Sequence, residues 1–308
     1  MIAQQSSGAP AAVAGPLAAQ VARSSALSPT ASTGSVIIPA HDEARVIGRL
    51  LSHITRATDA RDLEIVVVCN GCTDDTAAVA RQFAPVRVIE VETASKHAAI
   101  REGERHVAHY PRAYLDADVE IDAADLTLLM DVAEESGVLA VGPRRCLDLA
   151  RSSWTVRAFY RVWSCLPAVQ GLQGRGLIVV SRAGHERLRD WPALMADDLF
   201  VSTRFGPTER RVVDGASVTI HGPRTTRDLI RRRIRAAQGN AELVAWDPAL
   251  RSTGGQSVSS LFRQFSTRPA GWLDVLAFLA VTCVARISSR LHRRSLGGVW
   301  LRDDSSRA

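Results

Sequence analysis

Two acidic residues, Asp116 and Asp118, follow a short apolar run at residues 113–115 with one residue between them. On an extended strand, residues two apart point to the same side, so these carboxylates could share a divalent cation. A single aspartate beside a helix often serves only as a cap, but capping does not account for a pair directly after a strand. The spacing therefore favours a metal site.

Other polar and turn-forming residues follow two earlier apolar runs in the same way. They are Pro39, His41, Asp42 and Glu43 after residues 36–38, and Asn70, Gly71, Cys72, Thr73, Asp74 and Asp75 after residues 65–68. Asp42, Thr73 and Asp74 are also suited to capping helices, and this alternative stays open. A shared site at these positions requires that the ends of the apolar runs meet.

The apolar pattern indicates which elements would bring these residues together. From Ser35 on, short β-branched runs alternate with amphipathic stretches. The runs lie at residues 36–38, 65–68, 86–91 and 113–115, and the stretches at residues 45–54, 74–83 and 97–107. This alternation predicts an α/β fold with a mainly parallel central sheet and helices on both faces. Ligands of such sheets bind beyond the carboxyl ends of the strands, where the acidic residues gather.

Length and composition fit a folded protein of one large domain or two small ones. The chain has 308 residues, 46% hydrophobic and 23% charged, which excludes general disorder and a collagen-like repeat. Of 38 basic residues only Lys96 is a lysine, which singles it out. The five cysteines are odd in number and scattered, so a reducing compartment is the simpler expectation.

Four motifs in this pattern resemble those of the family 2 glycosyltransferases, which have the GT-A fold. The motifs are VIIPAHDE at residues 36–43, VVCNGCTDDT at residues 67–76, LDAD at residues 115–118 and ADDLF at residues 196–200. The resemblance covers residues 35–245 and depends on all four motifs in order, since each alone is weak. It implies an enzyme of the hexosyltransferase class that moves a sugar from a nucleotide diphosphate sugar to an acceptor hydroxyl with inversion.

The resemblance also implies where the donor binds. It assigns the nucleotide to Pro39, Glu43, Asn70, Asp74, Lys96 and Asp116, and a Mn²⁺ or Mg²⁺ ion on the diphosphate to Asp118. A solvated surface lysine is the alternative for Lys96. Asn70 stands where many relatives carry an aspartate, so the resemblance does not fix uridine as the nucleoside.

The general base and further donor contacts are implied in the second half. In the family the acidic motif at residues 196–200 provides the base, because the acceptor hydroxyl must lose its proton as it attacks. Asp198 aligns with that acid, whereas Asp197 could cap a helix that begins at Leu199. Candidates for contact with the donor phosphates or sugar are Arg175, Arg231, Arg232 and Arg233. A tight turn at residues 170–176 and a solvated basic helix face are the alternatives.

Composition divides the chain into three parts. Residues 1–34 are rich in Ala, Ser, Pro, Gly and Thr and predict a disordered tail. Residues 35–250 form the expected GT-A domain, with a nucleotide-binding half at residues 35–125 and an acceptor half at residues 126–250. Residues 251–308 are expected to form a helical extension.

An apolar stretch at residues 275–285 within this extension is followed by arginines. Its eleven residues would form a helix of about 16 Å, short of the roughly 30 Å of a bilayer core, so a transmembrane span is not expected. A membrane-interfacial helix, which would suit a lipid-linked acceptor, and a helix packed on the domain both fit. We expect a cytoplasmic protein, with peripheral contact at the inner face of the plasma membrane left open.

Three other classes of protein fit less well. A non-catalytic sugar-nucleotide-binding or scaffold protein of the same fold would have no need of Asp198. A sugar nucleotidyltransferase would need a glycine-rich loop after the first strand, which residues 39–43 do not provide. Nucleic-acid binding has only the arginines and the net charge of +6 in its favour, so no nucleic-acid partner is expected.

Overall fold

The computed structural model describes residues 34–56, 63–194, 196–250 and 271–295, together with positions 263 and 265. These residues belong to one compact unit within residues 33–308. The predicted tail at residues 1–34 lies outside the described residues except for Gly34, where the first strand begins.

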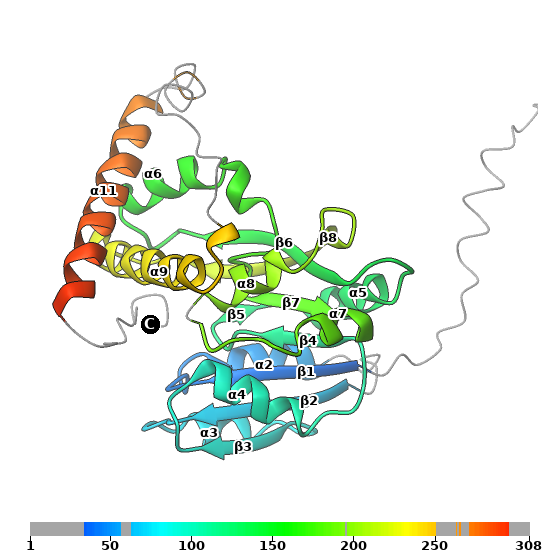
Figure 1. Cartoon of the computed structure of the whole chain (residues 1–308). Coiled ribbons are helices and arrows are strands. Elements are labelled where there is room, and N and C mark those ends of the chain that lie inside the picture. Colours follow the sequence, from blue (N-terminus) through cyan, green and yellow to red (C-terminus); the bar gives the residue numbers. More distant parts are fainter. Residues whose placement is uncertain are drawn as a thin grey trace, which may run out of the picture. The chain divides into compact units, whose positions relative to one another are not determined.

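An eight-stranded sheet forms the centre of this unit, in the order β3-β2-β1-β4-β7-β6-β8-β5 (Figure 1). The strands are β1 Gly34–Ala40, β2 Leu63–Asn70, β3 Arg87–Val91, β4 Arg112–Leu115, β5 Val119–Glu120, β6 Ala140–Asp148, β7 Leu177–Val180 and β8 Arg210–His221. β3, β2, β1 and β4 run parallel, with Val36 opposite both Ile65 and Ala113. β7 runs antiparallel to β4 and β6, while β6 and β8 are parallel and β5 is antiparallel to β8. The carboxyl ends of β1, β2 and β4 therefore meet at one edge, as the α/β prediction required.

Helices cover both faces of the sheet, because successive strand residues point to opposite faces. One face carries α2 Ile47–Thr55, α3 Thr76–Ala80 and α5 Ala123–Ala133, and the other carries α4 Lys96–Glu104 and α8 Asp197–Thr203, with α7 Arg182–Arg187 following β7. In β1, Val36 and Ile38 contribute to the first of these apolar layers, whereas Ile37 contributes to the second. The predicted fold class is thus confirmed.

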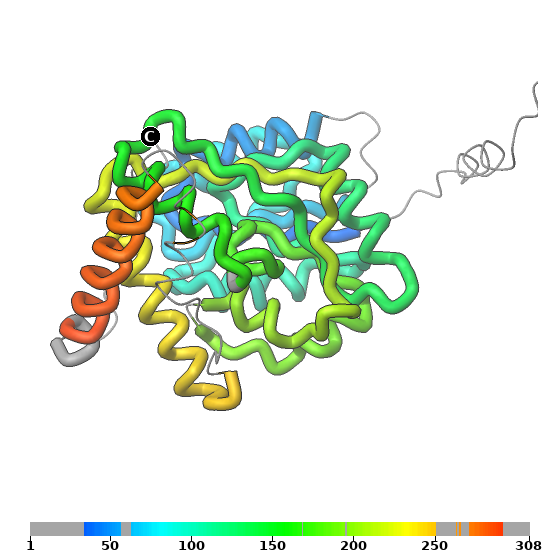
Figure 2. The backbone as a smooth tube through the Cα atoms, turned by 90° about the horizontal axis from the view of Figure 1, so that it is seen from above, coloured from blue at the N-terminus to red at the C-terminus, as the bar shows by residue number. Residues whose placement is uncertain are grey.

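A third apolar cluster joins α6 Trp154–Trp163, α9 Thr226–Trp246 and α11 Gly271–Ser295 (Figure 2). Phe278 of α11 stacks on Phe159 of α6, with ring centroids 5.1 Å apart. Asp274 of α11 accepts two hydrogen bonds from the guanidinium of Arg161, at 2.7 and 2.6 Å. One face of α11 is therefore packed on the domain. Two short 3₁₀ turns, Pro167–Val169 and Pro248–Leu250, complete the described elements.

The length of α11 corrects the argument from the apolar stretch at residues 275–285. That stretch is the middle of a helix of 25 residues. The segment Gly271–Leu291, with 21 residues, could cross a membrane by length and composition, and 39% of its most apolar window is buried in the protein. The expectation that the helix is too short was wrong, because polar residues such as Asp274 and Arg286 continue it on both sides.

Candidate active site

The loops after β1 and β2 are held together by side chains from both loops. Asp74 accepts hydrogen bonds from the backbone N–H of Ala44 and of Thr76, both at 3.1 Å. His41 Nδ1 lies 2.6 Å from the carbonyl oxygen of Asn70. These contacts fix the loops against each other, with Asp74 binding one backbone N–H at the start of α3 and one in the loop after β1.

Asn70 ends β2 with a side chain that is only 2% exposed. Its Nδ2 donates to the carbonyl of Ala40 at 2.8 Å, and its Oδ1 has no hydrogen-bond partner among the described residues. A buried acceptor without a partner costs free energy, so the Asn70 amide is an unusual feature at the end of β2. Glu43, also buried, starts the neighbouring turn, where its backbone N–H donates to Thr76 Oγ1 at 2.7 Å.

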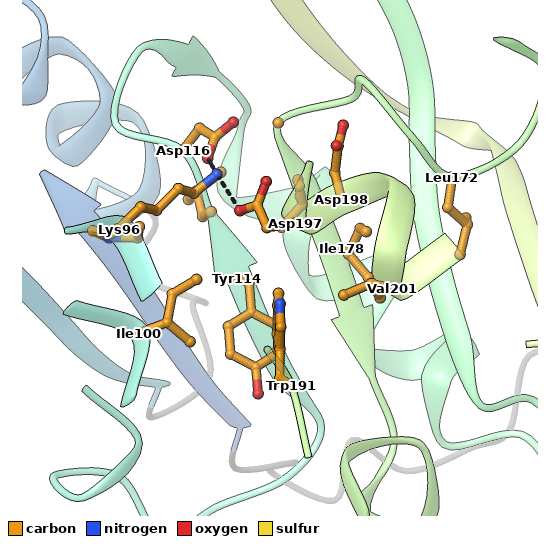
Figure 3. A pocket seen from close by; sticks show the side chains of 14 residues that line it. Lys96, Ile100, Tyr114, Asp116, Leu172, Ile178, Trp191, Asp197, Asp198 and Val201 are labelled. Atoms are coloured by element: carbon orange, nitrogen blue, oxygen red, sulfur yellow. Dashed lines mark hydrogen bonds and ion pairs between the residues drawn. The ribbon is translucent and has the colours of Figure 1, made fainter. Parts of the chain in front are cut away.

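Lys96 joins two of the predicted acidic residues. Ser95 caps α4 by accepting from the N–H of Ala98, which places Lys96 in the first turn. The Lys96 ammonium lies 2.6 Å from Asp116 Oδ1 and 2.8 Å from Asp197 Oδ2 (Figure 3). Burial acts to lower the pKa of Lys96, but the two carboxylates outweigh it and hold the pKa well above 10.5. The lysine therefore stays charged and is not a solitary surface side chain.

Asp116 and Asp118 lie in the turn between β4 and β5. The N–H of Asp116 donates to the carbonyl of Gly176 at 2.8 Å, which ties the turn to the start of β7. Burial, together with the charges of Asp118 and Asp197, raises the pKa of Asp116 to about 6 although Lys96 opposes this. The carboxylates are thus close enough to repel one another, and a divalent cation would relieve that repulsion. The donor set of carboxylate oxygens fits Mn²⁺ or Mg²⁺.

Gly176 makes this turn possible for a steric reason. Its φ is +68°, and a Cβ at this position would lie 2.4 Å from Val119 Cγ1. The close approach that the glycine permits is therefore between the β7 and β5 segments of the protein itself, and the tight-turn alternative describes this position well.

Asp198 differs in environment from its neighbour Asp197. The two oxygens of Asp198 accept from the backbone N–H of Gly174 at 2.5 Å and of Leu199 at 2.7 Å. Burial raises the pKa of Asp198, and the charge of Asp197 raises it further. In Figure 3 its carboxylate points away from the ion pair between Lys96 and Asp197. Asp198 is therefore a carboxylate with a raised pKa that two backbone N–H groups hold in place.

Asp197 is the first residue of α8, which begins two residues earlier than the sequence had indicated. Its carboxylate contacts Lys96 and makes no capping hydrogen bond to the helix. The predicted cap at this position is therefore replaced by an ion pair.

A pocket extends from these charged residues into the second apolar layer. Its lining includes Pro39, Lys96, Asp116, Asp197 and Asp198, with Ile100, Tyr114, Leu172, Ile178, Trp191 and Val201 beneath them. The rings of Tyr114 and Trp191 meet edge to face, with centroids 5.1 Å apart. Burial and the charge of Glu104 raise the pKa of Tyr114 well above 10, and its hydroxyl donates to Glu104 at 2.7 Å. The side chains beneath the carboxylates are thus mostly apolar, and Tyr114 is held in position by its contacts with Trp191 and Glu104.

Arg175 has a different role from the predicted contact with donor phosphate or sugar. The residue is 4% exposed, and its guanidinium donates to the carbonyls of Gly171, Pro143 and Gln170 at 2.8, 2.7 and 3.0 Å. Burial lowers its pKa to about 10. Arg175 therefore holds the glycine-rich loop at residues 170–176 in place from below, which in turn positions Gly174 beside Asp198.

The three predicted arginines of α9 do not line the pocket. Arg231 pairs with Asp228 on its own helix at 3.5 Å, and Arg233 lies over the ring of Phe159 at 5.7 Å. Arg232 lies close enough to Arg145 of β6 to lower the pKa of that residue. Arg145, Tyr114 and Trp191 were not named as site residues from the sequence, although GPRR at residues 142–145 stands out in it.

Comparison with known proteins agrees with the motifs and the geometry. The family described as Glycosyl transferase family 2 matches residues 35–189, about half of the chain. The chain belongs to this family. It is also 32% identical over 118 residues to a 4,4'-diaponeurosporenoate glycosyltransferase of Staphylococcus aureus strain MRSA252. That match covers 35% of this chain and 31% of the relative, so the chain spans about a third of the length of the curated relatives it matches.

Solved structures share the fold at low sequence identity. A mannosyltransferase from Pyrobaculum calidifontis, in complex with GDP-Man and Mn²⁺, has a TM-score of 0.56 and 21% identity, over 88% of this chain and 78% of that one. Glucosyl-3-phosphoglycerate synthase from Mycobacterium tuberculosis, in complex with Mn²⁺, UDP and glucosyl-3-phosphoglycerate, has a TM-score of 0.51 and 19% identity, over 70% and 80%. The predicted GT-A fold is confirmed by these likenesses.

Proposed function

We propose that this protein is an inverting glycosyltransferase that moves a sugar from a nucleotide diphosphate sugar to an acceptor hydroxyl. The observation that carries the proposal is Asp198, a carboxylate with a raised pKa that lines the same pocket as the ion pairs of Lys96 with Asp116 and Asp197. Family membership, the GDP-Man bound by one structural neighbour and the UDP bound by another support it.

The donor would bind across the carboxyl ends of β1, β2 and β4. Asn70 would lie beneath the nucleobase at the end of β2, where its amide offers a donor and an acceptor and does not select uracil, thymine or guanine. Asp118 with Asp116 would hold Mn²⁺ or Mg²⁺, of which Mn²⁺ is present in both neighbours, and the ion would neutralise charge on the diphosphate. Lys96 would add a second positive charge beside the same phosphates.

In the transfer step, Asp198 would accept the proton of the acceptor hydroxyl. The acceptor oxygen then bonds to the anomeric carbon while the bond from that carbon to the diphosphate oxygen breaks. Because attack and departure occur on opposite faces of the sugar, the anomeric configuration inverts. The backbone N–H groups of Gly174 and Leu199 hold the carboxylate still, and the raised pKa makes it a better base than a free aspartate.

The test is turnover of UDP-, GDP- and dTDP-sugars with Mn²⁺ or Mg²⁺ against a panel of hydroxyl acceptors, followed by NMR of the anomeric proton of the product. We expect a product of inverted configuration from the wild type and none above background from Asp198→Asn. A product of retained configuration would refute the mechanism. Binding of nucleotide sugar with no turnover, equal in wild type and Asp198→Asn, would favour a sugar-nucleotide-binding scaffold.

The outer face of α11 supports peripheral contact with a membrane. Trp272, Leu276, Val284, Ile287 and Leu291 are each between 45% and 60% exposed, and their spacing places them on one side of the helix. Arg286 and Arg290 are exposed near the end of this stripe and would meet anionic lipid headgroups. We therefore propose that the protein lies on the inner face of the plasma membrane and that its acceptor is lipid-linked.

Flotation with vesicles of phosphatidylcholine and phosphatidylglycerol tests this placement. Replacing Leu276 and Ile287 together by Asp should weaken binding by about tenfold or more, since each side chain would lose its transfer from water. Leu128→Asp, which changes a leucine of similar exposure on α5, is the matched control and should bind as the wild type does. Equal binding of all three proteins, or binding of none, would contradict the proposed membrane contact of α11.

A further inference from the structure

Arginines from three separate elements lie near one another, and one of them contacts the loop at residues 170–176. Arg145 comes from β6, Arg232 and Arg233 from α9, and Arg286 from α11. Burial lowers the pKa of Arg145, and the charge of Arg232 lowers it further. Burial likewise lowers the pKa of Arg233, with added contributions from Arg232 and Arg286. Like charges held this close repel one another, and a bound anion would offset that cost.

Aromatic side chains hold this cluster in place. The Arg145 guanidinium lies over the ring of Trp163, with Cζ 4.4 Å from the centroid. The Trp163 ring in turn meets Tyr160 edge to face, with centroids 5.4 Å apart. The guanidinium donates only at 3.3 Å to the carbonyls of Gly174 and Val169. Arg145 is therefore oriented by stacking while its hydrogen bonds to the protein remain long, so a stronger acceptor could replace them.

A single residue connects this cluster to the proposed base. The N–H of Gly174 donates to Asp198 Oδ2, and the carbonyl of the same residue accepts from Arg145 Nη1. A Cβ on Gly174 would lie 3.6 Å from Arg145 Nη1 and 4.0 Å from the Trp163 ring, so the loop runs directly along the cluster. Lys96 pairs with Asp116 and with Asp197, the residue before Asp198. Asp198 thus contacts the loop that binds Arg145, while its neighbour in sequence contacts the lysine of the predicted donor site.

We propose that Arg145 and Arg232 bind an acidic group of the acceptor, a phosphate or a carboxylate, and so present the acceptor hydroxyl to Asp198. The inference rests on the proposed glycosyl transfer and specifies its acceptor class. It assigns Arg232 to the acceptor, whereas the resemblance had assigned this residue to the donor phosphates or sugar. The same chemistry could come from a soluble phosphomonoester or from the headgroup of an anionic lipid, and Arg286 on α11 extends the cluster toward the apolar stripe that the lipid case requires.

Calorimetry of the full chain tests the subsite without knowledge of the acceptor. The probes are glycerol 3-phosphate, vesicles of phosphatidylcholine with or without phosphatidic acid, and, separately, UDP and GDP with Mn²⁺. We expect Arg145→Gln and Arg232→Gln to weaken binding of a phosphate probe by about tenfold or more, which corresponds to loss of one charge-assisted hydrogen bond. Arg144→Gln is the matched control, since Arg144 precedes Arg145 on β6 and is exposed. Its binding should equal that of the wild type.

The outcomes separate the possibilities. Binding of glycerol 3-phosphate that depends on Arg145 indicates a soluble acceptor, and binding of phosphatidic acid vesicles alone indicates a lipid. No binding of either probe to the wild type would overturn the proposal, as would equal loss in Arg144→Gln. If Arg145→Gln and Arg232→Gln also lose metal-dependent binding of UDP or GDP, the arginines contact the donor and not the acceptor. Failure of wild-type protein to bind any nucleotide, with anion binding intact, would instead count against the proposed function.

Discussion

Replacing Asp198 by Asn is the sharpest perturbation of the proposed chemistry, because the two side chains have the same shape. The loss of a general base lowers turnover by about 10² to 10⁴, or about 2.7 to 5.4 kcal/mol of transition-state stabilisation. The asparagine oxygen can keep one of the hydrogen bonds from Gly174 and Leu199, and loss of the other costs about 1 kcal/mol of stability. Removal of a charge beside Asp197 offsets part of that cost.

The assay is kcat with a saturating nucleotide sugar, beside nucleotide affinity by calorimetry and thermal unfolding. We expect Asp198→Asn to lose kcat while it binds nucleotide and unfolds nearly as the wild type does. Asp197→Asn is the comparison, because it removes a partner of Lys96 and should weaken nucleotide binding more than it lowers kcat. If Asp197→Asn abolishes kcat and Asp198→Asn retains it, the assignment of the base is refuted.

The pH dependence of the wild type follows from the same side chain. A general base acts only when ionised, and burial and Asp197 raise the pKa of Asp198 above 3.8. The value of kcat/KM should therefore rise with pH through that raised pKa and then level off. In Asp198→Asn the residual rate should lack this acid limb, and an unchanged limb would mean that another group titrates.

Three further substitutions test other parts of the account. Lys96→Gln should weaken nucleotide diphosphate binding about tenfold, measured by calorimetry against Arg101→Gln, which lies further along α4 outside the pocket. Glu64→Gln should lower the free energy of unfolding at pH 7 by about 1 kcal/mol, discounted for solvent exposure. Although burial acts to raise the pKa of Glu64, hydrogen bonds from the N–H groups of residues 108 and 109 lower it to about 2. In urea titrations the difference in unfolding free energy between wild type and variant should therefore be full above pH 4.5 and vanish as the pH falls through 2. Asp274→Ala should lower the free energy of unfolding by about 2 kcal/mol, because the Arg161 guanidinium loses the carboxylate that accepts two of its hydrogen bonds. An unchanged urea midpoint would show that α11 is held by apolar contacts alone.

Much of the nucleotide half could be predicted because its signals are local. The β-branched runs of β1, β2 and β4 and the residues directly after them specify which side chains share an edge, since parallel strands end together. Lys96 stood out by residue type alone, and its contact with Asp116 follows from the position of α4 after β3.

The second half depended on contacts that sequence spacing does not encode. Nothing in the sequence distinguishes Arg175 from Arg145. In the structure the Arg175 guanidinium donates to three backbone carbonyls, whereas the Arg145 guanidinium lies over the indole ring of Trp163. The pairing of Tyr114 with Trp191 joins residues far apart in the chain. The length of α11 was underestimated because only the apolar stretch at residues 275–285 was considered, whereas Asp274 lies within the helix and pairs with Arg161 of α6.

The most direct test of the central claim is a calorimetric titration of UDP, GDP and dTDP, each with and without Mn²⁺ or Mg²⁺, on wild type and on Asp118→Ala. The account predicts binding of one nucleotide that requires the metal and is lost in Asp118→Ala, with thermal unfolding of the variant unchanged. No binding of any nucleotide to folded wild-type protein, or metal-dependent binding that Asp118→Ala retains, would contradict it.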